Sequence, residues 1–270
     1  MIRKCNMLRE KQFAGFPPTY LLGSLILLFS LLLKIFFYSL EPLVSTDGCF
    51  YVAIIQKWHE SGEYDATIQY YRGSDWLPPL PLWLIKSSMF FGISATTAGF
   101  AWAFVLGAAL SVVAYGIASE ITQNKKIAVA TAFLTALHPS VNELGAEIQR
   151  DIFYLFFVGC SIWLICVASR RKKWFLWAVA AIPCGASVLC RFETFELLPL
   201  VICILFLLAV TKRIFWHKAV CYCCSFFAVF VATVIFLSFI AGTNNFFKGS
   251  VDLHLLGKWN SIFPQWRVKL

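Results

Sequence analysis

One acidic residue, Asp47, is the first candidate for a catalytic group in this sequence. It follows an apolar segment and precedes Gly48 and a pair of aromatic residues. A carboxylate in this position could accept the proton of a hydroxyl nucleophile and so act as a general base. Asp is also a favoured N-cap, the residue at which a helix begins, so Asp47 could equally cap a helix that starts here. The local spacing leaves both interpretations open.

Two further sites place an arginine beside a carboxylate. Arg150 adjoins Asp151, and Arg191 lies two residues before Glu193, each pair at the start of an apolar segment. A guanidinium group binds phosphate oxygens and a carboxylate accepts a proton, so such pairs suit an anionic substrate with a hydroxyl nucleophile. The alternative is that these side chains reach from a membrane boundary into water. Asp75 precedes a proline-rich turn and could be an ordinary turn residue.

The composition shows what kind of structure must position these groups. Hydrophobic residues make up 60% of the 270 positions and charged residues 14%, with a mean hydropathy of +0.74. A soluble domain has roughly 25% charged residues, so this composition excludes one. Apolar runs near the ~20 residues that cross a bilayer recur along the chain. We therefore predict an all-α polytopic membrane protein, whose net charge of +9 comes from its loops and not from a nucleic-acid site.

The apolar runs predict where the chain crosses the membrane. Six strong spans are expected, at 19–40, 96–118, 150–169, 174–190, 196–211 and 219–241, and two weaker runs lie at 80–93 and 127–140. Short basic loops face the cytoplasm, and the basic clusters here are Arg3 to Lys11, Lys125 and Lys126, Arg170 to Lys173, and Lys212 to Lys218. All four basic clusters lie on the same side of the membrane only if the run 127–140 crosses it and the run 80–93 does not. This solution predicts about seven transmembrane helices, with the amino terminus in the cytoplasm and the carboxyl terminus outside.

The same solution divides the chain into three parts. Residues 1–18 form a cytoplasmic tail, 19–241 a transmembrane domain, and 242–270 an extracytoplasmic tail. Nearly all acids then lie outside, many of them in a long first loop at 41–93. Within this loop, residues 48–61 predict a helix at the membrane interface, and 76–93 predicts an apolar helix that packs on the bundle without crossing.

At this point the order of the segments resembles that of a known family. The segments STDGCFYVA, WHESGEY, PPLPLWL and FFGIS, followed by QNKK, ALHPS, IQRDIFYLFF, RRKK and LCRFETFELLPL, are similar to successive parts of the dolichyl-phosphate-mannose-protein mannosyltransferase-like enzymes. These are GT-C membrane glycosyltransferases, of the glycosyltransferase family 39-like group. The likeness covers most of residues 19–210 and lies in the order and spacing of the segments.

The resemblance implies transfer of a sugar from a polyprenyl-phosphate carrier to an acceptor hydroxyl at the extracytoplasmic face, usually with inversion. It implies that Asp47 is the general base, and that outer arginines stabilise the leaving phosphate. The substrate-binding residues expected on this basis are Arg72, Asp75, Arg150, Asp151, Arg191 and Glu193. The expected partners are the lipid-linked donor, membrane lipids and a glycan, lipid or protein acceptor, without nucleic acid.

Two departures from the family pattern matter for the mechanism. Many relatives carry a second acid directly after the first, whereas Gly48 follows Asp47 here. The sequence therefore does not support a divalent metal, and we expect no cofactor. Relatives also continue with more spans. A non-catalytic membrane subunit, or a truncated remnant of such an enzyme, is therefore the alternative function. In either case we expect a multi-pass protein of the cell membrane, the inner one in a bacterium.

A small transporter is a third and weaker interpretation. Transporters bury polar groups between broken helices near the middle of the membrane, and the predicted spans contain few ionisable residues there. Lys34 lies near the outer end of the predicted span 19–40, and we expect its long side chain to reach the outer interface.

Overall fold

The computed structural model describes residues 19–40, 45–63 and 79–241. Arg72, Asp75 and both predicted tails lie outside these ranges. The described elements, in chain order, are α2 (Thr19–Leu40), α3 (Thr46–Ser61), α5 (Pro79–Met89), α6 (Ala95–Thr122), α7 (Lys125–Leu137), α8 (Pro139–Ala146), α9 (Arg150–Arg171), α10 (Trp174–Val188), the 3₁₀ helix η1 (Phe192–Glu196), α11 (Leu197–Val210) and α12 (Trp216–Ile240).

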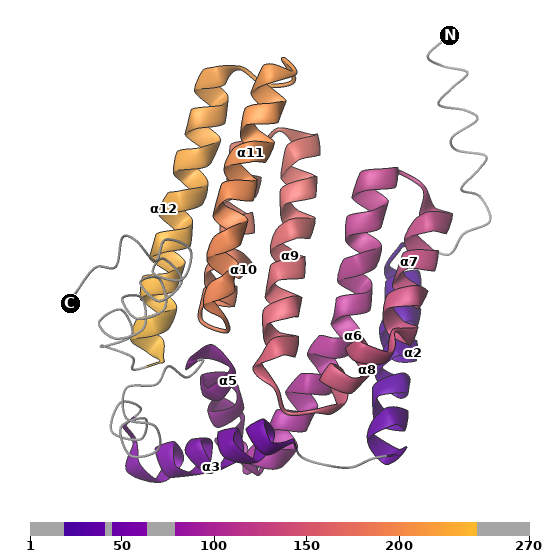
Figure 1. Ribbon diagram of the computed structural model, residues 1–270, viewed down its shortest axis with the longest axis vertical. Coiled ribbons are helices and arrows are strands. Elements are labelled where there is room, and N and C mark those ends of the chain that lie inside the picture. The colour runs from indigo at the N-terminus through magenta and orange to yellow at the C-terminus, as the bar shows by residue number, and fades with distance from the viewer. Residues whose placement is uncertain (1–18, 41–44, 64–78, 242–270) are drawn as a thin grey trace, which may run out of the picture.

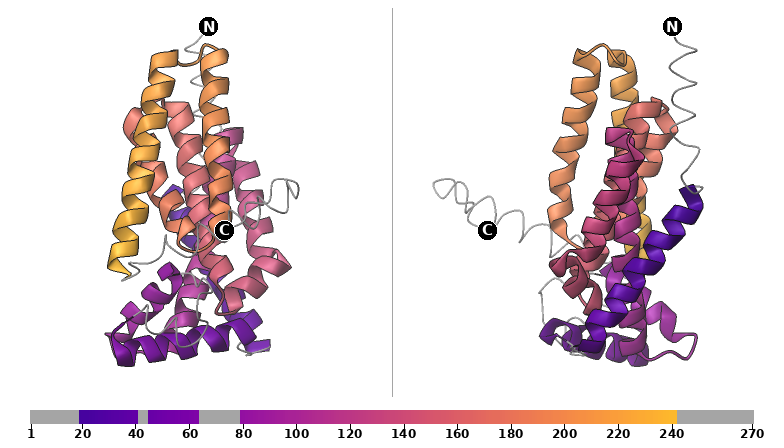
Figure 2. Two further views of the ribbon diagram at one scale, coloured as in Figure 1. Left: turned by 60° about the vertical axis from the view of Figure 1, so that its left-hand side comes forward. Right: turned by 90° about the vertical axis from the view of Figure 1, so that its right-hand side faces the viewer.

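The long helices run side by side in a bundle, and the short helices α3 and α5 lie across one end of it (Figure 1). Helix α6 packs against α2, α7 and α9, while α10 packs between α9 and α12. Figure 2 shows the same arrangement from two other sides, with α2 leaning across the bundle. We call the end that carries α3 and α5 the α3 end.

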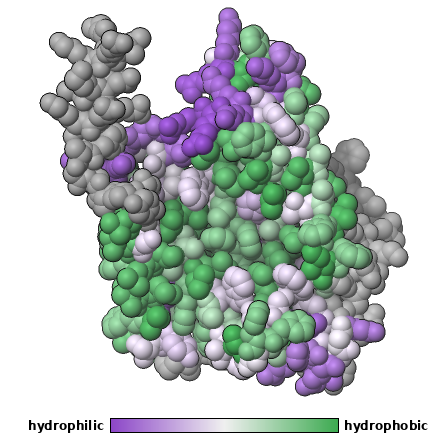
Figure 3. All heavy atoms as spheres, turned by 180° about the vertical axis from the view of Figure 1, so that it is seen from behind, coloured by the Kyte–Doolittle hydropathy of each residue, from purple (hydrophilic) through white to green (hydrophobic). Residues whose placement is uncertain are grey.

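The lengths of the helices agree with a protein that crosses a membrane several times. In the described residues five helical segments are long and apolar enough to span, at Leu21–Leu40, Ala95–Thr122, Arg150–Arg171, Phe192–Val210 and Trp216–Ile240. Figure 3 shows a broad hydrophobic surface along the bundle, with hydrophilic side chains towards its ends. The polytopic all-α fold is therefore confirmed.

The other two predicted spans are shorter than a membrane is thick. Helix α10 has 15 residues and α7 has 13, which at ~1.5 Å per residue is about 20 Å, against about 30 Å of hydrocarbon. Helix α7 ends at Leu137, two residues before Pro139. A proline cannot continue the helix, and it restricts the residue before it, His138, to an extended conformation. The total of seven spans stays a prediction.

The basic turns gather at the end of the bundle opposite α3. The α6–α7, α9–α10 and α11–α12 connections all lie there (Figure 1), and we call this the basic end. Arg170 of α9 and Glu120 of α6 form an ion pair of 2.7 Å at this end. The positive-inside rule, by which basic loops stay in the cytoplasm, predicts that these turns lie on one side. The cytoplasmic location of the basic end remains a prediction.

Small residues allow close contact between the helices. A Cβ atom added at Gly116 of α6 would lie 2.3 Å from the indole ring of Trp163 on α9. A Cβ at Gly185 of α10 would lie 2.9 Å from Thr233 of α12. Without a hydrophobic driving force in lipid, helices associate largely through such close packing of small residues. These glycines therefore set the spacing between neighbouring helices.

Lys34 departs from the sequence prediction. Its side chain is fully buried, and its Nζ donates a hydrogen bond of 2.5 Å to Oδ1 of Asn142 on α8. The lysine stem passes between Gly107 and Gly145, where an added Cβ would meet it at 3.0 and 2.7 Å. One turn earlier, Ser30 shares a 3.0 Å hydrogen bond with Ser111 of α6. The prediction that Lys34 reaches the interface is therefore wrong, because α8 covers it and supplies an acceptor inside the bundle.

Candidate functional site at the α3 end

Asp47 lies in the first turn of α3 and its side chain is exposed. The helix is capped by Ser45, whose Oγ accepts a 3.1 Å hydrogen bond from the amide of Gly48, and whose carbonyl accepts from the amide of Cys49 at 2.9 Å. The interpretation of Asp47 as the N-cap is therefore wrong. A carboxylate in the first turn is still favoured there, since it faces the positive end of the helix dipole.

Helix α3 is held on the bundle by one apolar face. Its buried residues Tyr51, Ile54, Ile55 and Trp58 recur at helical spacing, as expected for a helix with one covered face. The helix ends at Gly62, which adopts the left-handed conformation with φ of 77°. The surface helix predicted at 48–61 is therefore present, and it carries Asp47 at its amino-terminal end.

Helix α5 fixes α3 against the bundle. The amide of Leu80 donates to the carbonyl of Leu189 at 3.3 Å, which fastens the start of α5 beyond the end of α10. The ammonium of Lys86 lies 4.2 Å from the centre of the Trp58 ring on α3, a cation–π contact. With 11 residues α5 is far too short to span, in agreement with the prediction that this segment packs without crossing.

Three of the predicted charged residues meet at this end of the bundle. Arg191, in the link between α10 and η1, forms an ion pair through Nη1 with Asp151 in the first turn of α9. Its Nη2 and Nε atoms donate to the two carboxylate oxygens of Glu193 at 3.0 and 3.3 Å. We call these three residues the Arg191 cluster. The cluster joins elements that are 40 residues apart in the sequence.

The surroundings of the Arg191 cluster are partly apolar and strongly charged. The guanidinium carbon lies 5.6 Å from the centre of the Tyr154 ring. Arg150 lies close enough to Glu193 for their charges to interact. The hydrogen bonds to Glu193 raise the pKa of Arg191 above its ordinary value, so the guanidinium stays charged. Tyr154 was missed from the sequence, and its place one helical turn after Arg150 was the only signal.

The chemistry open to the cluster follows from its charges. The Arg191 guanidinium is engaged with two carboxylates, and the three side chains together carry one net negative charge. About a third of each side chain remains exposed, at 31% for Arg191, 30% for Asp151 and 33% for Glu193. A phosphate could therefore reach the guanidinium, but it would compete with the carboxylates already bound there. Arg150, half-buried beside the cluster, adds a second positive charge.

Asp47 and the Arg191 cluster lie at the same end of the bundle, because α3 crosses the end where α9 begins (Figure 1). In the part of the chain that the structure describes, no group of three or more His, Cys, Asp or Glu side chains is arranged to hold a metal ion. The roles predicted for Arg72 and Asp75 concern residues outside the described ranges. The described site thus consists of one exposed carboxylate and one partly buried charged cluster.

These features define the class of the molecule as a polytopic α-helical membrane protein with charged groups at one end of its bundle. The family model of dolichyl-phosphate-mannose-protein mannosyltransferase matches residues 77–238, which is more than half of the chain. The chain belongs to this family of glycosyltransferase-like membrane proteins. No curated protein matches it. The matched segment includes Arg150 and the whole Arg191 cluster, and it begins after Asp47.

Proposed function

We propose that this protein transfers a sugar from a polyprenyl-phosphate-linked donor to an acceptor hydroxyl at the extracytoplasmic face of the membrane. The observation that carries the proposal is the family match over residues 77–238, which covers the helices that form the Arg191 cluster. The acidic α3 end lies opposite the basic end, and sorting by positive charge would place the α3 end outside. The amino terminus would then be cytoplasmic.

In the proposed reaction Asp47 is the general base. The acceptor oxygen attacks the anomeric carbon, the bond from that carbon to the phosphate oxygen breaks, and the hydroxyl proton passes to the carboxylate. Attack opposite the leaving group inverts the anomeric centre. The exposure of Asp47 supports this role, because an acceptor arriving from water can reach it.

The leaving polyprenyl phosphate carries negative charge, and cationic side chains stabilise such charge. Arg150 and Arg191 are the described candidates, and Arg72 is the candidate outside the described residues. Asp151 and Glu193 would hold the Arg191 guanidinium in place, as their hydrogen bonds to it indicate. Asp75 remains a proposed substrate-binding residue.

The test measures release of free polyprenyl phosphate from a panel of sugar-loaded carriers, in membranes that contain the protein. Asp47→Asn should lower turnover at least about 100-fold, since general bases contribute about 10² to 10⁴. Glu60→Gln is the matched control, because Glu60 is an exposed acid near the other end of the same helix. The control should keep full turnover. Full activity in Asp47→Asn would remove Asp47 as the base.

A non-catalytic membrane subunit is the second candidate. Two observations favour it: the family match begins after Asp47, and Arg191 is already engaged by two carboxylates. On this reading the charged cluster holds α9 to the α10–η1 link and binds no phosphate. No turnover with any carrier, from protein shown to be inserted and folded, would support this candidate over the enzyme.

A further inference from the structure

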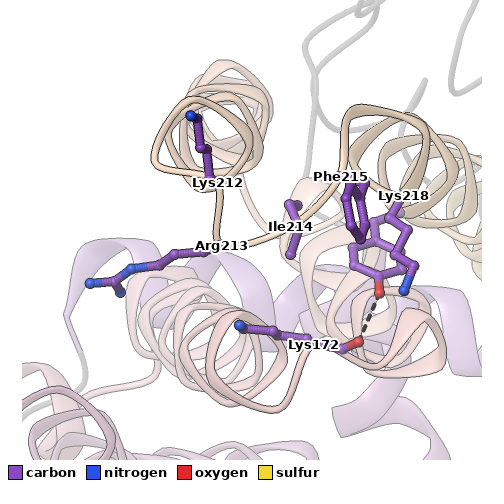
Figure 4. A pocket seen from close by; sticks show the side chains of 7 residues that line it. Lys172, Lys212, Arg213, Ile214, Phe215 and Lys218 are labelled. Atoms are coloured by element: carbon purple, nitrogen blue, oxygen red, sulfur yellow. Dashed lines mark hydrogen bonds between the residues drawn. The ribbon is translucent and has the colours of Figure 1, made fainter.

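A small pocket at the basic end has no part in the proposed reaction. It lies between the α9–α10 turn and the α11–α12 turn (Figure 4). Figure 1 shows these turns at the end of the bundle opposite α3, the helix that carries Asp47. Four cationic side chains line it, and no carboxylate does; these residues are Lys172, Lys212, Arg213 and Lys218. Its remaining walls are Ile214, Phe215 and Tyr222. The pocket therefore combines concentrated positive charge with an apolar wall.

The backbone around the pocket is held in place by hydrogen bonds. The hydroxyl of Tyr222 on α12 donates to the carbonyl of Lys172 at 2.7 Å, which ties the two turns together (Figure 4). The amides of Arg213 and Ile214 both bond to the carbonyl of Leu208, at 2.9 and 3.2 Å, and close the end of α11. Ile214 is buried beneath the turn. The pocket is therefore built on main-chain segments that hydrogen bonds hold in place.

The position of the cationic side chains suits an anion that approaches from outside the bundle. In Figure 4, Arg213 and Lys172 extend to the same side of the α11–α12 turn, whereas Lys212 extends away from them. Lys218 lies within reach of the Phe215 ring, with its ammonium 5.8 Å from the ring centre. The guanidinium of Arg213 and the ammonium of Lys172 can each bind phosphate oxygens.

Exposed aromatic residues indicate the depth of the pocket in the membrane. Trp174 and Trp216, at the starts of α10 and α12, are more than half exposed, at 59% and 56%. Tryptophan collects at the level of lipid headgroups. Directly along the helices from the pocket, Leu207 and Val210 of α11 and Val220 of α12 expose apolar side chains. The pocket thus lies at headgroup level, above a surface on which acyl chains can pack.

We propose that this pocket binds the phosphate headgroup of an anionic phospholipid. Basic pockets between helix ends at a membrane surface are suited to such headgroups, because the phosphate meets several cations while its chains stay in the bilayer. A free phosphate ion shares the charge but lacks the chains. The apolar surface of α11 and α12 favours the lipid over the free ion. The inference does not depend on the proposed sugar transfer.

The test is native mass spectrometry of the purified full chain with dioleoylphosphatidylglycerol, dioleoylphosphatidylcholine or inorganic phosphate. Phosphatidylglycerol should remain bound in preference to phosphatidylcholine, and millimolar phosphate should not displace it. Arg213→Gln with Lys218→Gln should weaken phosphatidylglycerol binding about 30-fold, since each basic residue near the surface contributes about five-fold. Arg213→Lys keeps the charge and should keep the affinity within a few-fold.

The matched control is Lys125→Gln with Lys126→Gln, which removes the same charge from the same end but outside the pocket. This variant should retain the lipid. Equal loss in both double variants would show only general attraction to a basic surface and would overturn the proposal. Displacement of the lipid by inorganic phosphate alone would overturn it as well, in favour of a free-anion site. Unchanged helical circular dichroism shows that each variant is folded.

Discussion

Replacement of Gly116 by alanine tests how closely α6 and α9 are packed. The added Cβ would lie 2.3 Å from Cε2 and 2.6 Å from Cδ2 of Trp163. Carbon atoms in contact normally lie about 3.5 to 4.0 Å apart, so the overlap exceeds roughly 1 Å. The indole is a rigid ring and not the end of a flexible chain. Either the ring must leave its place or the two helices must separate.

The size of the effect follows from two opposed contributions. Overpacking of a close contact costs about 1 to 3 kcal/mol. Alanine in place of glycine within a helix contributes up to about 1 kcal/mol in the other direction. Gly23→Ala on α2 isolates the second contribution, because nothing lies within 4 Å of its added Cβ. The difference between the two variants should therefore be about 1 to 3 kcal/mol, with Gly116→Ala the less stable.

Thermal unfolding of the purified protein in detergent is the assay. For a chain of this size about 1 kcal/mol shifts the midpoint by roughly 2 to 4 °C. Trp163→Leu should make room for the new methyl group, so that Gly116→Ala costs little in that background and the two changes are not additive. Equal midpoints for Gly116→Ala and Gly23→Ala, or full additivity with Trp163→Leu, would refute the packing between α6 and α9.

Three other predictions concern topology, the buried lysine and pH. In a cysteine-free protein, Glu60→Cys should react with a membrane-impermeant thiol reagent from outside, and Lys172→Cys should react only after permeabilisation. The reverse pattern would show that the predicted topology is wrong. Asn142→Leu should lower the free energy of unfolding by about 3 kcal/mol, because the charge of Lys34 loses its acceptor. Adding Lys34→Met should restore most of that stability, and thermal unfolding of both variants measures the two effects. Burial lowers the pKa of Lys86 below its ordinary 10.5, so the unfolded chain binds this proton more tightly. The free energy of unfolding should therefore rise as the pH approaches 10.5, and Lys86→Met should remove that rise in denaturant titrations.

Most of the fold follows from apolar length, because lipid forces backbone groups to bond within helices. The predicted span 150–169 is α9, from Arg150 to Arg171, and the predicted 196–211 is α11, from Leu197 to Val210. These limits are set by local composition, which a sequence displays directly. The interface helix 48–61 followed from its own spacing of apolar residues for the same reason.

The site was less predictable, because its contacts depend on which elements meet. The sequence placed Arg191 beside Glu193 and Arg150 beside Asp151. The ion pair between Arg191 and Asp151 was not predicted, because it requires the start of α9 to meet the link after α10. Ser45 and Asp47 are both good capping residues, and the choice between them depends on the backbone at Ser45, which is extended with ψ of 159°.

Lys34 shows the same limit inside the membrane. A lysine near the end of an apolar segment normally reaches the interface. Here Gly107 and Gly145, from two other helices, leave a slot for its stem, and Asn142 supplies the acceptor. Neither glycine is informative alone, and their juxtaposition arises only from the packing of α2, α6 and α8.

The bond between Lys34 and Asn142 also has a consequence for how the protein is made. The two residues are 108 positions apart, so at about 5 to 20 residues per second the ribosome needs roughly 5 to 20 s to complete the pair. During that interval α2 leaves the translocon with a lysine whose acceptor has not been synthesised, at a cost of about 3 kcal/mol if it lies deep in lipid. Lys34 can therefore take its buried place between the helices only after α8, which carries Asn142 and Gly145, has been made.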